Sequence, residues 1–170
     1  MYVSGIQYES VVDGIGIRNT LFISGCRHNC KGCHNPETHN FKYGYEFTID
    51  KQKEFIKKCK ENPLLDGITL SGGDPLFSAN ELIPFIDRYK KANPTHTIWI
   101  YSGFTFEQIK NNDEMFSLIK KCDILVDGKF ILALKDLALK FRGSSNQRII
   151  DIQKSLENKN VILYEEMIEW

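Results

Sequence analysis

Three cysteines lie within eight positions of the sequence, in the segment CRHNCKGC. Cys26, Cys30 and Cys33 have the spacing C-x3-C-x2-C, which lets one irregular loop wrap around a single centre. Thiolates are the usual ligands of iron–sulfur clusters and are common ligands of zinc. The spacing differs from the two-residue gaps and trailing Cys-Pro of bacterial ferredoxins. The segment therefore predicts a metal centre, and the spacing alone leaves a cluster, a zinc ion and unligated thiols as alternatives.

The alternatives differ in the fourth ligand. A structural zinc site needs a fourth protein ligand, which His34 or His28 could supply. An iron–sulfur cube held by three cysteines instead leaves one iron without a protein ligand. The other two cysteines, Cys59 and Cys122, lie in segments with helical patterns. We expect these two to be small buried hydrophobic residues rather than ligands.

Short apolar segments alternate with helical patterns and predict the elements that position these residues. The predicted strands cover residues 20–24, 67–71, 97–101, 123–127 and 160–164, and the predicted helices cover 50–62, 78–91 and 106–121, the last with a break near 111–113. This alternation predicts an α/β fold with a mainly parallel sheet and right-handed crossovers. A complete eight-stranded βα barrel usually needs about 250 residues. We therefore expect residues 1–170 to form a single domain with a partial, open barrel.

The segment 78–91 carries the best-marked helical pattern. Ser78 and Glu81 have the spacing of a capping box. Pro84 lies past the first turn and is expected to kink or delay the helix. The apolar stripe of this helix consists of Leu82, Phe85, Ile86 and Tyr89.

Glycines and polar residues follow the first four predicted strands, in the segments SGC, SGGDP, SG and DG. In open α/β sheets and βα barrels, ligands bind at the carboxyl ends of the strands, so these segments are expected to converge. Gly72 and Gly73 let the backbone approach a ligand closely. Asp74 adds a carboxylate that could pair with an ammonium group. The alternative interpretation of SGGDP is a plain strand-to-helix turn.

Two further segments are rich in glycine or polar residues. Residues 12–19, VDGIGIRN, contain Gly-x-Gly, but they precede a strand and so lack the context of a dinucleotide site. Residues 141–148, FRGSSNQR, group two arginines, two serines, an asparagine and a glutamine around Gly143. Such a segment is either an ordinary polar loop or a site for a carboxylate, a ribose or a protein partner.

Charge and composition exclude several classes of function. The chain has 22 Lys and Arg against 22 Asp and Glu, which does not favour nucleic acid as the main partner. No apolar run approaches the roughly 18 residues of a membrane helix, and the first residues lack a secretory signal. We therefore expect a cytosolic protein, where thiols stay reduced and a tight cysteine cluster binds metal or is catalytic.

Several segments resemble one enzyme superfamily. CRHNCKGC matches the signature of radical S-adenosylmethionine enzymes, and SGGDP resembles their glycine-rich motif. DGIGIRNTLFISGC resembles the start of glycyl-radical-enzyme activases. KGCHNPE, SGGDPL, YSGFTFE, LVDGKF and FRGSSNQRIID together are similar to the activating subunits of anaerobic ribonucleoside-triphosphate reductase, over residues 12 to about 152. Two positions depart from the superfamily: Asp74 replaces a common Glu, and Gly32 stands where an aromatic residue is frequent.

The resemblance implies a function and a mechanism. Cys26, Cys30 and Cys33 would hold a 4Fe–4S cluster whose open iron binds the amino and carboxylate groups of S-adenosylmethionine. One electron, from a flavodoxin or ferredoxin, would cleave the cofactor to methionine and a 5′-deoxyadenosyl radical. That radical would take a hydrogen from a glycine of the large reductase subunit, whose Cα hydrogens are unshielded by a side chain.

The same resemblance implies contacts to the cofactor and the partner. The cofactor contacts are Gly72, Gly73 and Asp74 for the methionyl ammonium, Ser102 and Asp127 for the cofactor or a nearby cation, and Arg142, Ser144 and Asn146 for the carboxylate or ribose. The segment DGIGIR is expected near the glycine loop of the partner, and its simpler interpretation is a turn that aims the first strand.

Other functions remain as alternatives. The chain could activate a different glycyl-radical enzyme, such as a formate-lyase type, or act on a small molecule. From a different class comes a zinc-stabilised binding module that uses the three thiolates and His34.

Overall fold

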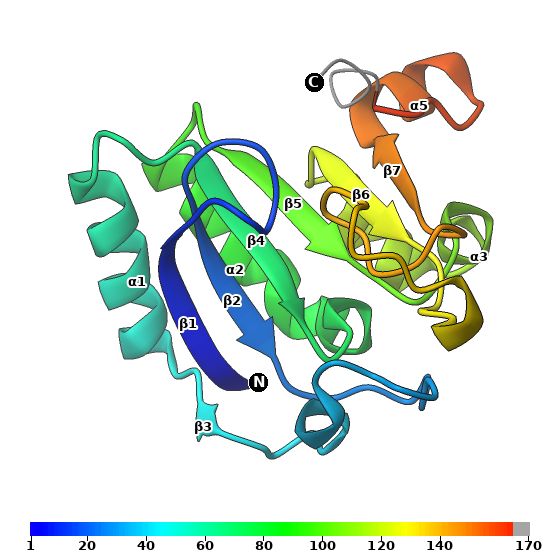
Figure 1. The fold of residues 1–170 in the computed structure, drawn as a ribbon. Coiled ribbons are helices and arrows are strands. Elements are labelled where there is room, and N and C mark those ends of the chain that lie inside the picture. The colour runs from blue at the N-terminus through cyan, green and yellow to red at the C-terminus, as the bar shows by residue number, and fades with distance from the viewer. Residues whose placement is uncertain (165–170) are drawn as a thin grey trace.

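The computed structural model describes residues 1–164, so the terminal segment EEMIEW lies outside the described residues. Its centre is a seven-stranded sheet with the order β3-β1-β2-β4-β5-β6-β7 (Figure 1). The strands are β1 (Tyr2–Ser10), β2 (Arg18–Ile23), β3 (Tyr45–Glu46), β4 (Gly67–Gly72), β5 (Thr97–Tyr101), β6 (Ile124–Asp127) and β7 (Arg148–Asp151). The four central strands, β2, β4, β5 and β6, run parallel, and β1, β3 and β7 are added antiparallel. The predicted α/β class and open, mostly parallel sheet are confirmed, and the sheet does not close into a barrel.

Helices cover one face of the sheet, and all but the last of them connect its parallel strands (Figure 1). They are α1 (Ile49–Glu61), α2 (Ala79–Ala92), α3 (Phe106–Lys110), α4 (Asp113–Ile119) and α5 (Ile152–Asn158), with short 3-10 turns at Pro36–His39, Pro75–Ser78 and Leu132–Leu134. The register of the strands explains the covered face, because successive residues of a strand point to opposite sides. Aligned side chains on the helix side form a fully buried row, Leu21, Leu70, Ile100, Leu125 and Ile150.

The opposite face of the sheet contains a buried cation, Arg18. Its guanidinium donates five hydrogen bonds, of 2.7 to 3.1 Å. The acceptors are the hydroxyls of Thr69 and Thr97 and the carbonyls of Ile15, Ile68 and Thr97. All of its donors are therefore used, as burial of a charge requires. Burial lowers the pKa of this guanidinium to about 10. The side chain joins the turn before β2 to the starts of β4 and β5.

One predicted strand is wrong. The segment 160–164 forms a single bridge, Ile150 with Leu163, and is not a strand. The last strand of the sheet is instead β7, which pairs antiparallel with β6 through the buried residues Ile149 and Ile150. Only four residues long and preceded by a polar segment, β7 gives little periodicity to detect. The strands β1 and β3, at the other side of the sheet, were not predicted either.

Two details of the helix predictions are also wrong. The capping box is absent, since Ser78 makes no side-chain cap and the carboxylate of Glu81 contacts the N-terminal amine of Met1. Asp74 instead caps the 3-10 turn that leads into α2, accepting from the Leu76 amide (3.0 Å). Pro84 also does not delay the helix, which begins at Ala79.

Other features of the predicted helices are confirmed. The stripe of Leu82, Phe85, Ile86 and Tyr89 is completely buried. The break near 111–113 separates α3 from α4, where the Asn112 side chain accepts a hydrogen bond from the Met115 amide.

The role of Arg18 leads to a test by urea unfolding of the metal-free chain. Arg18→Ala leaves the buried Ile68 carbonyl, two part-buried carbonyls and two hydroxyls without this donor, so we expect the free energy of unfolding to fall by about 3 kcal/mol. The control is Lys57→Ala on the exposed side of α1, expected to change it by less than about 0.5 kcal/mol. Equal stabilities of the two variants would contradict the assigned role.

Candidate metal centre

The three cysteines line one cleft, of about 470 Å³, at the carboxyl ends of the parallel strands. The same cleft is lined by Gly72 and Gly73 at the end of β4, by Ser102 after β5 and by Gly128 after β6. The structure therefore confirms the prediction that four strand ends converge. Chain segments up to about a hundred residues apart in sequence meet around one space.

Residues with left-handed backbone lie within the cysteine loop, residues 26–33, and directly before it. Gly25 (φ +112°), Asn29 (+50°) and Gly32 (+73°) take this conformation, which asparagine and glycine adopt most readily. The amide of Cys33 donates to the carbonyl of Cys30 (3.1 Å) and closes a tight turn with Gly32 at its third position. An aromatic residue would be strained there, which gives a local reason for glycine at this position.

The cysteines of the loop differ from the other two in exposure. Cys26, Cys30 and Cys33 are partly exposed, whereas Cys59 and Cys122 are completely buried, as predicted. Burial raises the pKa of the Cys26 thiol to about 11, opposed by a hydrogen bond from the His28 amide. Within residues 1–164 no three Cys, His, Asp or Glu side chains are gathered around one point as they would be about a single ion. A cluster has a separate iron for each thiolate, so its ligands need not meet at one point.

Gly72 and Gly73 bring the ends of β2 and β4 into contact. A Cβ atom at Gly72, whose φ is +103°, would lie 2.6 Å from the Ile23 backbone, and one at Gly73 would lie 2.7 Å from the Gly25 carbonyl oxygen. The Gly73 amide donates to Ile23 (2.7 Å), and the Asp74 amide donates to Gly25 (3.0 Å). The glycines therefore hold the start of the cysteine loop against the SGGDP turn, and they also line the cleft.

Asp74 lies beneath this turn and is 1% exposed. Its Oδ2 accepts from the Ser102 hydroxyl and the Gly103 amide, both at 2.9 Å, and lies 2.6 Å from His28 Nε2. Asp74 is not among the residues that line the cleft. The structure thus brings Ser102 and Asp74 together, and the Asp74 carboxylate is bonded within the scaffold rather than lining the cleft.

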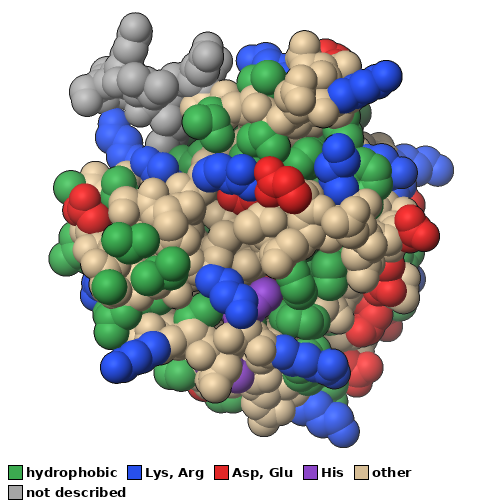
Figure 2. Space-filling view, turned by 90° about the vertical axis from the view of Figure 1, so that its right-hand side faces the viewer, with side chains coloured by type: hydrophobic (Ala, Val, Ile, Leu, Met, Phe, Trp, Pro, Cys, Tyr) green, Lys and Arg blue, Asp and Glu red, His purple; other side chains and the backbone are tan. Residues whose placement is uncertain are grey.

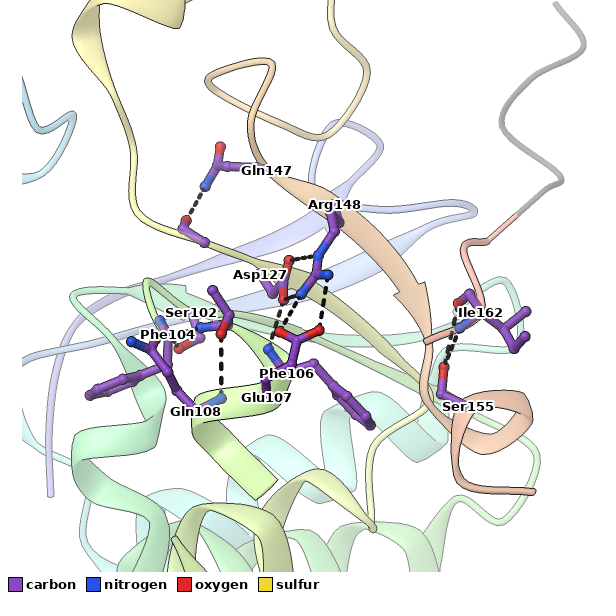
Figure 3. Close-up of polar contacts among 12 residues, drawn as sticks. Ser102, Phe104, Phe106, Glu107, Gln108, Asp127, Gln147, Arg148, Ser155 and Ile162 are labelled. Atoms are coloured by element: carbon purple, nitrogen blue, oxygen red, sulfur yellow. Dashed lines mark hydrogen bonds and ion pairs between the residues drawn. The ribbon is translucent and has the colours of Figure 1, made fainter. Parts of the chain in front are cut away.

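Asp127 takes part in a separate ion-pair network (Figure 3). Its carboxylate accepts from Arg148 and from the Phe106 amide (2.8 Å), so it holds the start of α3 and the start of β7 at the end of β6. Arg148 also donates to both oxygens of Glu107 (2.8 and 3.1 Å), and these bonds lower the pKa of Glu107 to about 2. Asp127 lines a neighbouring pocket of about 530 Å³ rather than the cysteine cleft.

The three residues predicted in FRGSSNQR have different surroundings. Arg142 lines the cleft and donates from Nη1 to the Gln147 carbonyl (3.0 Å), while its buried Nε has no partner among the described residues. Ser144 is completely buried and accepts from the Ile131 amide (3.2 Å). Asn146 is exposed and donates to the Lys129 carbonyl (2.9 Å). Only Arg142 of the three faces the cysteines' cleft.

An apolar groove continues from the cleft. It is formed by residues 11–17 and 137–141, and four of these residues, Val12, Leu137, Leu139 and Phe141, line both the groove and the cleft. Val12 is 66% exposed and Leu137 is 88% exposed. Sequence patterns did not mark residues 137–140, because leucines in a segment without regular structure have no periodicity to read.

Two further residues of the cleft were not predicted as site residues of a cluster. His28 and His39 lie in its lining together with His34, and only His28 sits in the middle of the cysteine loop. The only feature of the sequence that marked His28 as a site residue was its place between Cys26 and Cys30.

The surface in Figure 2 carries dispersed Lys and Arg side chains, with hydrophobic and uncharged ones between them. Within residues 1–164, no helix combines the length and the apolar character needed to cross a bilayer.

Comparisons with known proteins agree with this site. Residues 12–150 match the family model described as a 4Fe-4S single cluster domain. A relative from Haemophilus influenzae is 39% identical over 85% of this chain and 95% of its own length, and one from Escherichia coli K12 is 37% identical over 81% and 90%. A relative from Vibrio cholerae is 39% identical over 82% of this chain and 90% of its own. All three are named anaerobic ribonucleoside-triphosphate reductase-activating protein. The chain belongs to this family of activating proteins.

Proposed function

We propose that this chain is a radical S-adenosylmethionine enzyme that installs the glycyl radical of the anaerobic ribonucleotide reductase. The observation that carries the proposal is the shared cleft, in which three partly exposed cysteines face the ends of four strands. The open sheet with parallel central strands is compatible with a partial barrel of the radical S-adenosylmethionine type, which we propose as its architecture.

The residues of the cleft fit a 4Fe–4S cluster. Cys26, Cys30 and Cys33 offer three soft thiolates, one for each of three irons. Cys59 and Cys122 are buried within the helical layer and do not line the cleft, so the chain supplies no fourth cysteine. A cluster held by these thiolates would supply one electron for cleavage of the carbon–sulfur bond of S-adenosylmethionine to methionine and a 5′-deoxyadenosyl radical, and that radical would take a hydrogen from a glycine of the reductase.

The remaining residues of the cleft have binding roles in this proposal. Gly72 and Gly73 keep the wall of the cleft at the end of β4 free of side chains, so that the methionyl group can approach the backbone there. Arg142 presents a guanidinium whose Nε lacks a partner among the described residues, which suits the cofactor carboxylate.

In this proposal the other residues predicted to contact the cofactor support the walls of the cleft instead of binding the cofactor themselves. Ser102 lines the cleft, but its hydroxyl is bonded to Asp74. Asp127, Ser144 and Asn146 hold neighbouring loops through the bonds described above. A flavodoxin or ferredoxin in the cytosol is the proposed electron donor.

We also propose that the apolar groove receives the glycine-bearing loop of the reductase. The groove leads directly into the cysteine cleft, so a bound loop could extend its glycine to the cofactor. Asp13, in the DGIGIR segment, accepts hydrogen bonds from the hydroxyls of Ser10 (2.6 Å) and Thr20 (2.9 Å), and therefore orders one wall of the groove. Asp13→Ala would disturb this wall as well as any contact to the partner, so an exposed residue gives the cleaner test.

Reconstitution with iron and sulfide without oxygen tests the cluster assignment. Wild-type chain should bind both in the ratio of a 4Fe–4S cluster, cleave S-adenosylmethionine under a reductant and produce a glycyl radical on the reductase, detected by electron paramagnetic resonance. Cys30→Ala should lose all three properties, because one iron loses its ligand. Cys59→Ala, which changes a buried cysteine, is the matched control and should keep them.

Three results would go against the cluster proposal. One equivalent of zinc with no iron or sulfide would favour the zinc-stabilised binding module, to which His34 in the cleft offers a fourth ligand. A radical on a formate-lyase type enzyme but not on the reductase would identify a different target. Conversion of a small molecule in the absence of any partner protein would indicate a third class of reaction.

Val11→Asp tests the groove, at a residue that is 65% exposed and lines the groove but not the cysteine cleft. Placing a charge where an apolar loop is expected should weaken binding of the reductase by about tenfold or more. Cleavage of S-adenosylmethionine without the reductase should remain unchanged. Leu64→Asp, at a residue that is 68% exposed outside the groove, is the control and should bind normally. Equal affinity of both variants, measured by titration with the reductase, would remove the groove from the interface.

A further inference from the structure

His28 is the only long polar side chain of the cysteine loop that is buried. Arg27, Asn29 and Lys31 are exposed, whereas the His28 side chain is 6% accessible. Its ring lies near those of Phe77 and Phe104, with centroid distances of 5.4 and 4.5 Å. The ring therefore reaches under the loop into the scaffold.

The scaffold has space for this ring because residue 103 is a glycine. A Cβ atom at Gly103 would lie 2.4 Å from Cδ2 of His28. Both Gly103 and Phe104 belong to the segment after β5, and Phe77 lies in the turn after β4. One histidine thus joins the cysteine loop to the ends of two parallel strands.

The ring is also fixed by the hydrogen bond between His28 Nε2 and Asp74 Oδ2 (2.6 Å). That oxygen already accepts from Ser102 and Gly103, so the ring nitrogen is the donor in this contact. The other oxygen, Oδ1, accepts from the Leu76 amide. With four donors on its two oxygens, the buried carboxylate has used the acceptor sites that a carboxylate commonly offers.

We propose that His28 is a positioning residue and that Asp74 acts through it rather than on the cofactor. His28 lies two residues after Cys26 and two before Cys30, so fixing its ring fixes the backbone between both ligands. The consequence for cluster binding rests on the proposed function, whereas the contact itself is a property of the metal-free chain. The loop is pre-ordered before the cluster binds, because its conformational entropy is lost during folding.

Alkylation of the metal-free chain tests the contact, with Cys26 as the reporter and Cys59 as the internal standard. His28→Phe keeps an aromatic ring between Phe77 and Phe104 but removes the donor, and Asp74→Asn removes one of the two carboxylate oxygens. Each should speed alkylation of Cys26 by about tenfold. The double variant should be no faster than either single variant, because both changes break the same contact. An unchanged slow rate at Cys59 confirms that the fold is intact.

Two further variants sharpen this test. His28→Gln retains a side-chain N–H donor and should restore a rate near that of the wild type. Lys31→Ala, at an exposed position of the same loop, should leave the rate unchanged. Wild-type rates at Cys26 in both single variants would overturn the proposal. So would an acceleration in the double variant equal to the product of the single effects, since Asp74 would then act independently of His28.

The reconstituted chain gives an independent readout. His28→Phe and Asp74→Asn should lose iron to a chelator about tenfold faster than wild type, by the same factor in each variant. They should also alter the paramagnetic resonance spectrum of the reduced cluster. Wild-type iron retention in both variants would overturn the positioning role while leaving the proposed function intact. A wild-type chain that binds no iron would defeat the proposed function, and the alkylation rates would still decide the contact.

Discussion

The close approach of the ends of β2 and β4 is the constraint on which the rest of the site depends. Two amides, of Gly73 and Asp74, donate to carbonyls at the end of β2, and this spacing tolerates no side chain at residues 72 and 73. The cysteine loop therefore begins against the turn that carries Asp74. Both lie at the edge where the parallel strands end, which is where α/β sheets commonly bind ligands. Without this approach, His28 could not reach Asp74 and the thiols would not face the later strand ends.

The two faces of the sheet differ in their packing, and the face opposite the helices combines the buried cation Arg18 with a smaller apolar cluster that includes Trp99 and Val126. The helix side is a continuous apolar layer, whereas the other side holds Arg18 and its hydroxyl and carbonyl partners near the starts of the strands. The three cysteines lie at the opposite ends of the same strands. The buried cation therefore lies near the starts of the strands. Loops with glycine and left-handed residues occupy the carboxyl ends.

Much of the fold was predictable because its central strands and helices have strong periodicity. The four parallel strands, the stripe of α2 and the burial of Cys59 and Cys122 follow from local patterns alone. The strands β1, β3 and β7 escaped prediction because short or half-exposed strands carry weak patterns. In the site, the cysteines and the two glycines of SGGDP were recognisable from spacing. The contact between His28 and Asp74 was not, because it joins residues that are 46 positions apart and depends on Gly103 in a third segment.

The central claim is that the three thiolates leave one iron open for a small molecule. Electron–nuclear double resonance on the reduced, reconstituted chain, with S-adenosylmethionine labelled by ¹⁵N at its amino group, tests this most directly. The account predicts a ¹⁵N coupling that shows the amino group of the cofactor bound to the cluster and that is replaced by a ¹⁴N coupling in the unlabelled sample. A spectrum that does not change when the cofactor is added, together with a coupling from a histidine of the chain, would contradict it.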